Sequence, residues 1–156
     1  MQRDVDAGEE LCGEYVPVYY ARAARREALS KYRFHCACEA CAVSDAAAAR
    51  SDADRERFGS LYRSLYATPP TDRGALAKVG AMLDVVAREF GDSPAMARRV
   101  LQDAVIIANA QGRATEATDF MRRLYDASVL SEGADTAASR RFAAFRADAR
   151  RFRPSD

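Results

Sequence analysis

The spacing of apolar residues over positions 45–153 constrains the fold more than any other feature of the sequence. Apolar side chains recur there at intervals of three and four, which is the repeat of a helix that buries one face. Proline or glycine interrupts this pattern at Pro69-Pro70, Gly91, Gly112 and Gly133. The pattern therefore predicts five helices of about 20 residues with short loops, and short loops place successive helices antiparallel.

The five predicted helices run over 46–67, from a cap at Thr71 or Asp72 to Gly91, from Ser93-Pro94 to Gly112, over 114–131, and over about 135–152. Helices of similar length in series favour stacked hairpins of the tetratricopeptide kind. One apolar stripe on each helix forms the predicted core: Phe58, Leu61, Tyr62, Leu65, Tyr66; Leu76, Val79, Leu83, Val86, Phe90; Met96, Val100, Leu101, Val105, Ile106; Ala117, Phe120, Met121, Leu124, Tyr125; Phe142, Phe145, Phe152.

Composition excludes several classes of function. The 156 residues suffice for one ordinary domain or two small ones, and a formal net charge of +1 argues against bulk electrostatic capture of nucleic acid or membrane. No apolar run approaches the roughly 20 residues that span a bilayer, and the polar start lacks a signal-peptide core. We therefore expect an intracellular protein, in the nucleus or cytoplasm, with reduced thiols. A basic tail is expected to be solvated, with an acidic partner or nucleic acid as the alternative: Arg140, Arg141, Arg146, Arg150, Arg151 and Arg153.

The first 44 residues differ from the helical region and contain nearly all the candidate chemistry. A run rich in valine and tyrosine is interrupted by Gly13 and Pro17, which predicts a short strand ending at Pro17. Residues 21–31 contain helix formers and predict a short helix with Ala24, Ala28 and Leu29 on one side. The chain accordingly divides into residues 1–31, 32–44 and 45–156.

Three of the four cysteines lie close together, as Cys36-x-Cys38-x-x-Cys41. Thiols this near cannot easily bridge each other, because a disulfide requires a specific geometry. They can converge on one soft cation, and Zn²⁺ is the usual ion for tetrahedral thiolate ligation. We favour Cys12 or water as the fourth ligand over His35, since adjacent His35 and Cys36 cannot easily face the same ion. Cys12 has the alternative of a small buried apolar residue.

The cysteine run belongs to a longer ordered set of residues: Gly8-Glu9-Glu10-Leu11, Tyr15, Arg25-Arg26, Leu29, Tyr32, Phe34, Cys36, Cys38 and Cys41. With this set the chain resembles the end of the SET domain and the post-SET zinc segment of SET-and-MYND-type protein lysine methyltransferases. The resemblance implies a mainly α protein: a short β remnant of a SET domain, a post-SET cysteine loop, and an antiparallel, tetratricopeptide-like bundle of about five helices.

The resemblance also implies roles for individual residues. Tyr15 matches the tyrosine whose hydroxyl lies by the target amine, and Tyr32 matches a second aromatic lining the lysine channel. Phe34 matches the aromatic that packs on the adenine of S-adenosylmethionine. The zinc thiolates of the family match Cys36, Cys38 and Cys41. The expected cofactors are thus Zn²⁺ and S-adenosylmethionine, and the expected partner is a protein with a target lysine.

The family binds its cofactor chiefly through a glycine-containing motif and an asparagine-histidine motif, and neither precedes Gly8 here. The family's fourth zinc ligand also comes from that region, and Glu14 stands where the family places a small or weakly polar residue. We expect the C-terminal part of a lysine methyltransferase that is inactive alone. The alternative is a non-catalytic helical interaction module with a small zinc knuckle. A third possibility is that another polypeptide completes the site.

Overall fold

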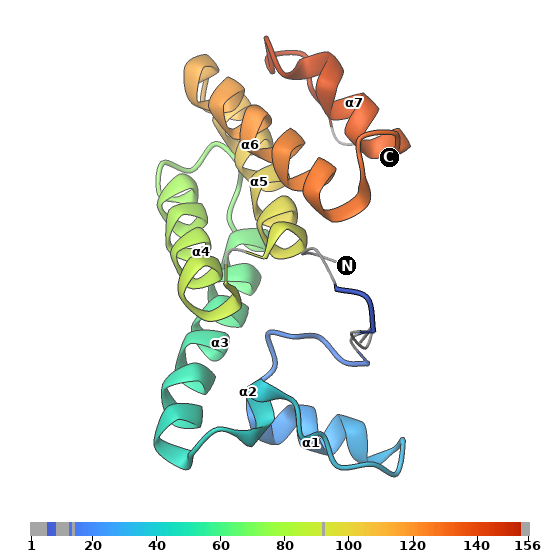
Figure 1. Ribbon diagram of the computed structural model, residues 1–156. Coiled ribbons are helices and arrows are strands. Elements are labelled where there is room, and N and C mark those ends of the chain that lie inside the picture. Colours follow the sequence, from blue (N-terminus) through green and yellow to red (C-terminus); the bar gives the residue numbers. More distant parts are fainter. Residues whose placement is uncertain (1–5, 9–12, 14, 92, 154–156) are drawn as a thin grey trace.

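The computed structural model describes residues 6–8, 13, 15–91 and 93–153, and within them the chain is mainly helical (Figure 1). The helices are α1 (Arg22–Ser30), α2 (Glu39–Ala42), α3 (Asp45–Tyr66), α4 (Ala75–Phe90), α5 (Pro94–Ala110), α6 (Ala114–Glu132) and α7 (Ala137–Phe145). The five helices predicted after residue 45 and the short one before the cysteines are confirmed. No helix in the described ranges combines the length and the apolar character needed to cross a membrane.

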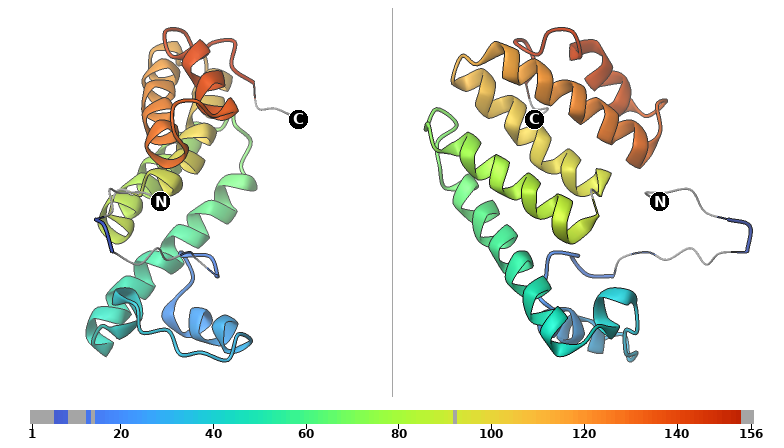
Figure 2. Two further views of the ribbon diagram at one scale, coloured as in Figure 1. Left: turned by 45° about the vertical axis from the view of Figure 1, so that its right-hand side comes forward. Right: turned by 60° about the vertical axis from the view of Figure 1, so that its left-hand side comes forward.

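Helices α3 to α7 form a row in which each helix packs against the next in the sequence (Figure 2). One apolar cluster lies between α3, α4 and α5, and a second lies between α5, α6, α7 and the chain after α7. Helix α5 contributes to both, because Val100 and Ile107 face the first cluster whereas Leu101 and Val105 face the second. The core of the helical region is therefore continuous through α5.

The helix boundaries follow local signals at most ends. The hydroxyl oxygens of Ser44 and Ser93 accept hydrogen bonds from backbone N–H groups in the first turns of α3 and α5. Gly91 ends α4 with a φ of 57°, a conformation that costs glycine little. The predicted cap at Thr71 or Asp72 is wrong, since α4 begins only at Ala75. Turns occupy the intervening residues, where the Asp72 carboxylate accepts a hydrogen bond from the Gly74 N–H at 2.7 Å.

Two details of the predicted core differ from the structure. Met82 and Val85 are completely buried, although the predicted stripe of α4 omits them. This helix lies between α3 and α5, so it buries two faces and not one. Tyr66 belongs to the predicted core, but the structure leaves it 67% exposed in the last turn of α3.

The last predicted helix is too long. Helix α7 ends at Phe145, and the chain turns so that Phe152 is buried in the second cluster. The rings of Phe145 and Phe152 meet edge to face with centroids 5.5 Å apart. Seven residues of continuous helix would separate them by about 10 Å along the axis. The turn is held by the Asn109 side chain, which donates to the Ala149 carbonyl at 2.8 Å.

The predicted short strand is not formed at Gly13 or over 15–17, and its other residues, 11, 12 and 14, lie outside the described ranges. A turn follows instead, closed by a hydrogen bond from the Tyr20 N–H to the Pro17 carbonyl at 3.1 Å. Proline favours this outcome because it cannot donate to a strand ladder.

Helix α1 lies beside the beginning of α3, with the short α2 next to it (Figure 1). The Arg22 N–H donates to the Asp52 carboxylate at 2.6 Å, and its guanidinium pairs with Asp45 at 2.7 Å. The buried face of α1 contains Arg25 and Leu29, whereas Ala24, which the sequence groups with Leu29 on one side of the helix, is exposed. These polar contacts hold the segment to the helical row, together with Val18 and Tyr19, which pack against the first apolar cluster.

Candidate metal centre

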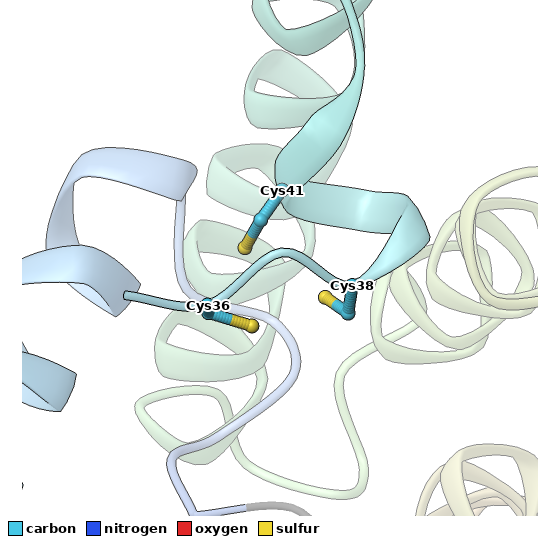
Figure 3. Close-up of side chains that lie close together, drawn as sticks. All are labelled: Cys36, Cys38 and Cys41. Atoms are coloured by element: carbon cyan, nitrogen blue, oxygen red, sulfur yellow. The ribbon is translucent and has the colours of Figure 1, made fainter. Parts of the chain in front are cut away.

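The three cysteines of the Cys-x-Cys-x-x-Cys motif meet at the beginning of α2 (Figure 3). The Sγ atoms of Cys36, Cys38 and Cys41 all lie within 4.8 Å of one another. In Figure 3 the sulfur atoms of Cys36 and Cys38 point toward each other, and the sulfur of Cys41 points toward the same space. Cys41 is buried, Cys36 is half-buried and Cys38 is exposed, so the group lies at the protein surface with one ligand anchored inside.

Local backbone structure produces this convergence. Residues 34–37 carry no regular secondary structure, and Cys38 adopts an extended conformation as the residue before α2. The N–H groups of Cys41 and Ala42 both donate to the Cys38 carbonyl, at 2.8 and 2.9 Å. This single turn brings the Cys41 sulfur back over the chain that precedes it.

The thiols influence one another's acidity. Burial tends to raise the pKa of Cys38, but hydrogen bonds from the Cys36 and Cys41 thiols and from backbone N–H groups outweigh it and lower that pKa. For Cys36, a backbone hydrogen bond from Cys38 acts to lower the pKa, yet the thiol contacts and partial burial together raise it. The Cys38 thiol therefore ionises more readily than the Cys36 thiol in the metal-free cluster.

The donor set fits a zinc ion. Tetrahedral Zn²⁺ holds thiolates at about 2.3 Å, which places pairs of sulfurs about 3.8 Å apart. The observed separations reach this geometry with small side-chain adjustments, and all three thiols are free of disulfides. His35 is exposed and does not join the group of converging ligand atoms. Cys12, the other candidate for the fourth position, lies outside the described residues.

Two arginines of α1 contact the third ligand and its surroundings. Arg25 reaches the Cys41 sulfur at 3.9 Å, and Arg26 donates to the Cys41 carbonyl at 3.3 Å. The role of Arg25 cannot be predicted from the sequence, since a charged residue on a short helix is ordinarily placed on the solvent side. Its partners include backbone carbonyls, which leave no pattern in the sequence.

The three aromatic residues singled out from the sequence also come together. The ring of Tyr15 lies 5.4 Å from that of Tyr32 and 5.6 Å from that of Phe34, measured between centroids. Arg33 separates the latter two with a φ of 58°, a conformation rare outside glycine. All three rings are exposed: 64% for Tyr15, 55% for Tyr32 and 42% for Phe34. The cluster is an open aromatic surface, and its members Tyr32 and Phe34 directly precede the cysteines in the chain.

A shallow depression of about 250 Å³ lies between α1 and the segment that leads to the cysteines. Apolar side chains, arginines and one of the three converging cysteines line it: Arg26, Leu29, Ser30, Arg33, Phe34, His35 and Cys36. The depression thus adjoins both the aromatic cluster, through Phe34, and the metal centre, through Cys36.

Comparisons with protein-family models, with curated proteins and with solved structures found no match for this chain. The resemblance to SET-and-MYND-type methyltransferases accordingly remains a prediction from the residues of the first segment. What the described residues establish is a helical protein with a cysteine cluster capable of binding a metal ion.

Proposed function

We propose that the chain is the C-terminal part of a SET-domain protein lysine methyltransferase that uses S-adenosylmethionine, with a post-SET loop held by Zn²⁺. One observation supports this most: the fold brings Tyr15 against Tyr32 and Phe34, although a whole helix, α1, separates it from them in the sequence. These are the residues that the family resemblance assigns to the lysine channel and the cofactor. The thiolates of Cys36, Cys38 and Cys41 would hold the zinc.

The chemistry requires alignment more than acid–base power. A methyl group passes from a sulfonium to a neutral amine, so the carbon–sulfur bond breaks as the carbon–nitrogen bond forms, and the amine proton leaves to solvent. Tyrosine hydroxyls can orient the amine without adding a charge, and aromatic rings attract both the sulfonium and the methylammonium product. In this proposal Tyr15 and Tyr32 orient the lysine, and Phe34 contacts the adenine.

The proposed site needs a second wall. The aromatic cluster is open to solvent, and the 64% exposure of Tyr15 leaves its ring without the enclosure that methyl transfer requires. We propose that the SET core, with its glycine-containing and asparagine-histidine motifs, covers this face, and that the isolated chain has no activity. The helical row would act as a tetratricopeptide-like surface for the protein substrate or another partner, in the nucleus or cytoplasm.

The test begins with the gene. We expect an in-frame asparagine-histidine motif in the DNA upstream of Met1, and an extended protein that methylates lysine when given S-adenosylmethionine. Tyr15→Phe should lower its turnover at least tenfold, because the hydroxyl that orients the amine is lost. The matched control Tyr66→Phe alters an exposed hydroxyl on α3 and should leave turnover unchanged. An upstream region without these motifs, or an extended protein without methyl transfer, would overturn the proposal.

A second candidate is a non-catalytic helical interaction module with a zinc knuckle. The observation that favours it is the independent core of α3 to α7, whose two clusters are built almost entirely from the helical row. Such a module would retain its fold and its partner without any SET core. Methyl transfer by the extended protein, lowered at least tenfold by Tyr15→Phe, would reject this candidate.

A further inference from the structure

Arg25 on α1 is buried beside the metal centre, although arginine is rarely buried without a partner. The residue exposes 6% of its surface. One terminal nitrogen donates to the Tyr20 carbonyl at 2.5 Å. The other donates to the Ala40 carbonyl at 3.1 Å and lies 3.9 Å from the Cys41 sulfur. A single guanidinium therefore contacts the turn before α1, helix α2 and a candidate zinc ligand.

The charge of this guanidinium has no counter-charge among the side chains that the structure describes. No carboxylate of those side chains, which do not include that of Glu39, lies within ion-pair distance of Arg25. Its acceptors are two neutral carbonyls and a sulfur, and a buried charge without compensation is costly. Three thiolates around one divalent ion have a net charge of −1. The metal-loaded centre would supply the counter-charge that Arg25 otherwise lacks.

Arg26 provides an internal comparison. It is the next residue on α1 and also approaches Cys41, but it is exposed and donates to the backbone carbonyl, not to the sulfur. Water screens its charge, and its contact does not reach the ligand atom. If a nearby positive charge were sufficient to support the metal centre, Arg25 and Arg26 would affect zinc binding equally.

The other side of the same turn is held by a second buried arginine. Arg55 on α3 donates to the Val18 carbonyl and pairs with Glu89 on α4 at 2.6 Å. Burial lowers the pKa of Arg55, and the nearby charge of Arg25 lowers it further, whereas Glu89 opposes this change. Two guanidinium groups thus hold the turn over residues 17–20: that of Arg25, beside the cysteines, and that of Arg55, on α3.

We propose that Arg25 is the positioning residue of the metal centre. Its guanidinium orients the Cys41 sulfur by a charge-assisted hydrogen bond and compensates the negative charge of the metal–thiolate group. Because it also holds the Tyr20 carbonyl, it couples metal binding to the docking of residues 17–20 on α3. This inference rests on the zinc centre of the proposed function, but not on methyl transfer.

Zinc affinity of the full chain, measured by competition with a chromophoric chelator, tests the assignment. Arg25→Gln and Arg25→Met should each weaken zinc binding at least tenfold. Loss of a group that contacts a metal ligand typically lowers metal affinity by about 10–100-fold. Arg26→Gln should change it less than twofold. With Co²⁺ as the probe, the thiolate-to-metal absorption band should move to longer wavelength in both Arg25 variants, because a sulfur that loses a hydrogen bond gives up electron density more easily.

Thermal unfolding of the metal-free chain separates positioning from a merely structural role. Arg25→Met removes a buried uncompensated charge, so its metal-free midpoint should equal or exceed that of the wild type, while its zinc affinity still falls. A lower metal-free midpoint with unchanged zinc affinity and an unchanged cobalt spectrum would overturn the inference. Failure of the wild type to bind zinc would instead reject the metal centre itself, which distinguishes the two outcomes.

Discussion

The helical row and the first segment are stabilised by different forces. Helices α3 to α7 bury two apolar clusters in which many side chains are completely inaccessible to solvent. The segment over 15–44 is joined to that row by polar contacts of Arg22 and Arg55 and by packing of Val18 and Tyr19 against the first apolar cluster. Apolar burial stabilises the row without a ligand, whereas the segment has few apolar contacts and relies also on charged groups and on the three thiols. The row should therefore tolerate loss of metal, and the segment should not.

Removing one sulfur should produce the largest effect. Cys36→Ser leaves only two thiols in the cluster. Zinc affinity should therefore fall by more than about 100-fold, which is the upper end of the effect of losing a residue that contacts a ligand and not the metal. Far-ultraviolet circular dichroism should still report the helices of the row, because their core does not include the cysteines. Cys12→Ser is the companion variant: a comparable loss would identify Cys12 as the fourth ligand, and no loss would exclude Cys12 from that position. Unfolding of the whole chain by Cys36→Ser would show that the row is not stable independently of the first segment.

Substitutions in the core of the row should lower the free energy of unfolding and leave zinc affinity unchanged. Leu124 on α6 is completely buried in the second cluster, so Leu124→Ala should lower the free energy of unfolding by about 3 kcal/mol. Leu130 on the same helix is 67% exposed, and Leu130→Ala should cost less than about 0.5 kcal/mol. Urea denaturation measures both changes. Zinc affinity should stay within twofold of the wild type in each variant, and a large loss of affinity in Leu124→Ala would show that the two regions are not separate.

A carboxyl group on α5 should make the stability of the row depend on pH. Burial raises the pKa of Asp103 to about 6, from an ordinary value of 3.8. The folded state therefore binds the proton more tightly, and the free energy of unfolding should rise by about 2 kcal/mol as the pH falls from 7 to 4. Asp103→Asn should raise stability at pH 7 and remove most of this dependence. In urea titrations at several pH values, the exposed control Asp126→Asn should keep the wild-type slope.

The smallest expected effect concerns the backbone between Tyr32 and Phe34. Arg33 has a φ of 58°, a conformation that costs a non-glycine residue about 1–2 kcal/mol. A glycine at this position would remove that cost, but its greater freedom in the unfolded chain would offset part of the stabilisation. Arg33→Gly should therefore stabilise the zinc-loaded segment by about 0.5 kcal/mol, measured by amide hydrogen exchange over α1. Gly112→Ala is the reciprocal variant in the row, where a φ of 70° predicts destabilisation. Loss of protection in Arg33→Gly would show that the arginine side chain itself holds the turn.

The same division explains which features could be predicted from the sequence. The helices of the row were predictable because the apolar period and the breaking residues are local signals. The burial of Met82 and Val85 was not, since it depends on α4 lying between two other helices. The end of α7 depends on how Phe152 packs against Phe145 across a turn, which no local pattern specifies.

In the first segment, spacing alone brought the cysteines to attention, and their convergence is confirmed. Burial of Arg25 could not be predicted, because its acceptors are the carbonyls of Tyr20 and Ala40 and a sulfur from a different element. The grouping of Tyr15 with Tyr32 and Phe34 was suggested only by the family resemblance. Long-range polar contacts of this kind arise from the tertiary arrangement and leave no periodic trace.

The position of α5 between the two apolar clusters has a consequence for fragments of this chain. A cut at Gly112 would leave the upstream piece with α3, α4 and α5, and hence with every buried member of the first cluster. The downstream piece would keep α6 and α7 but lose Leu101, Val105 and Ala108, the wall against which they pack. The two halves are thus unequal: the upstream piece can fold without its complement, and the downstream one requires α5 as a template.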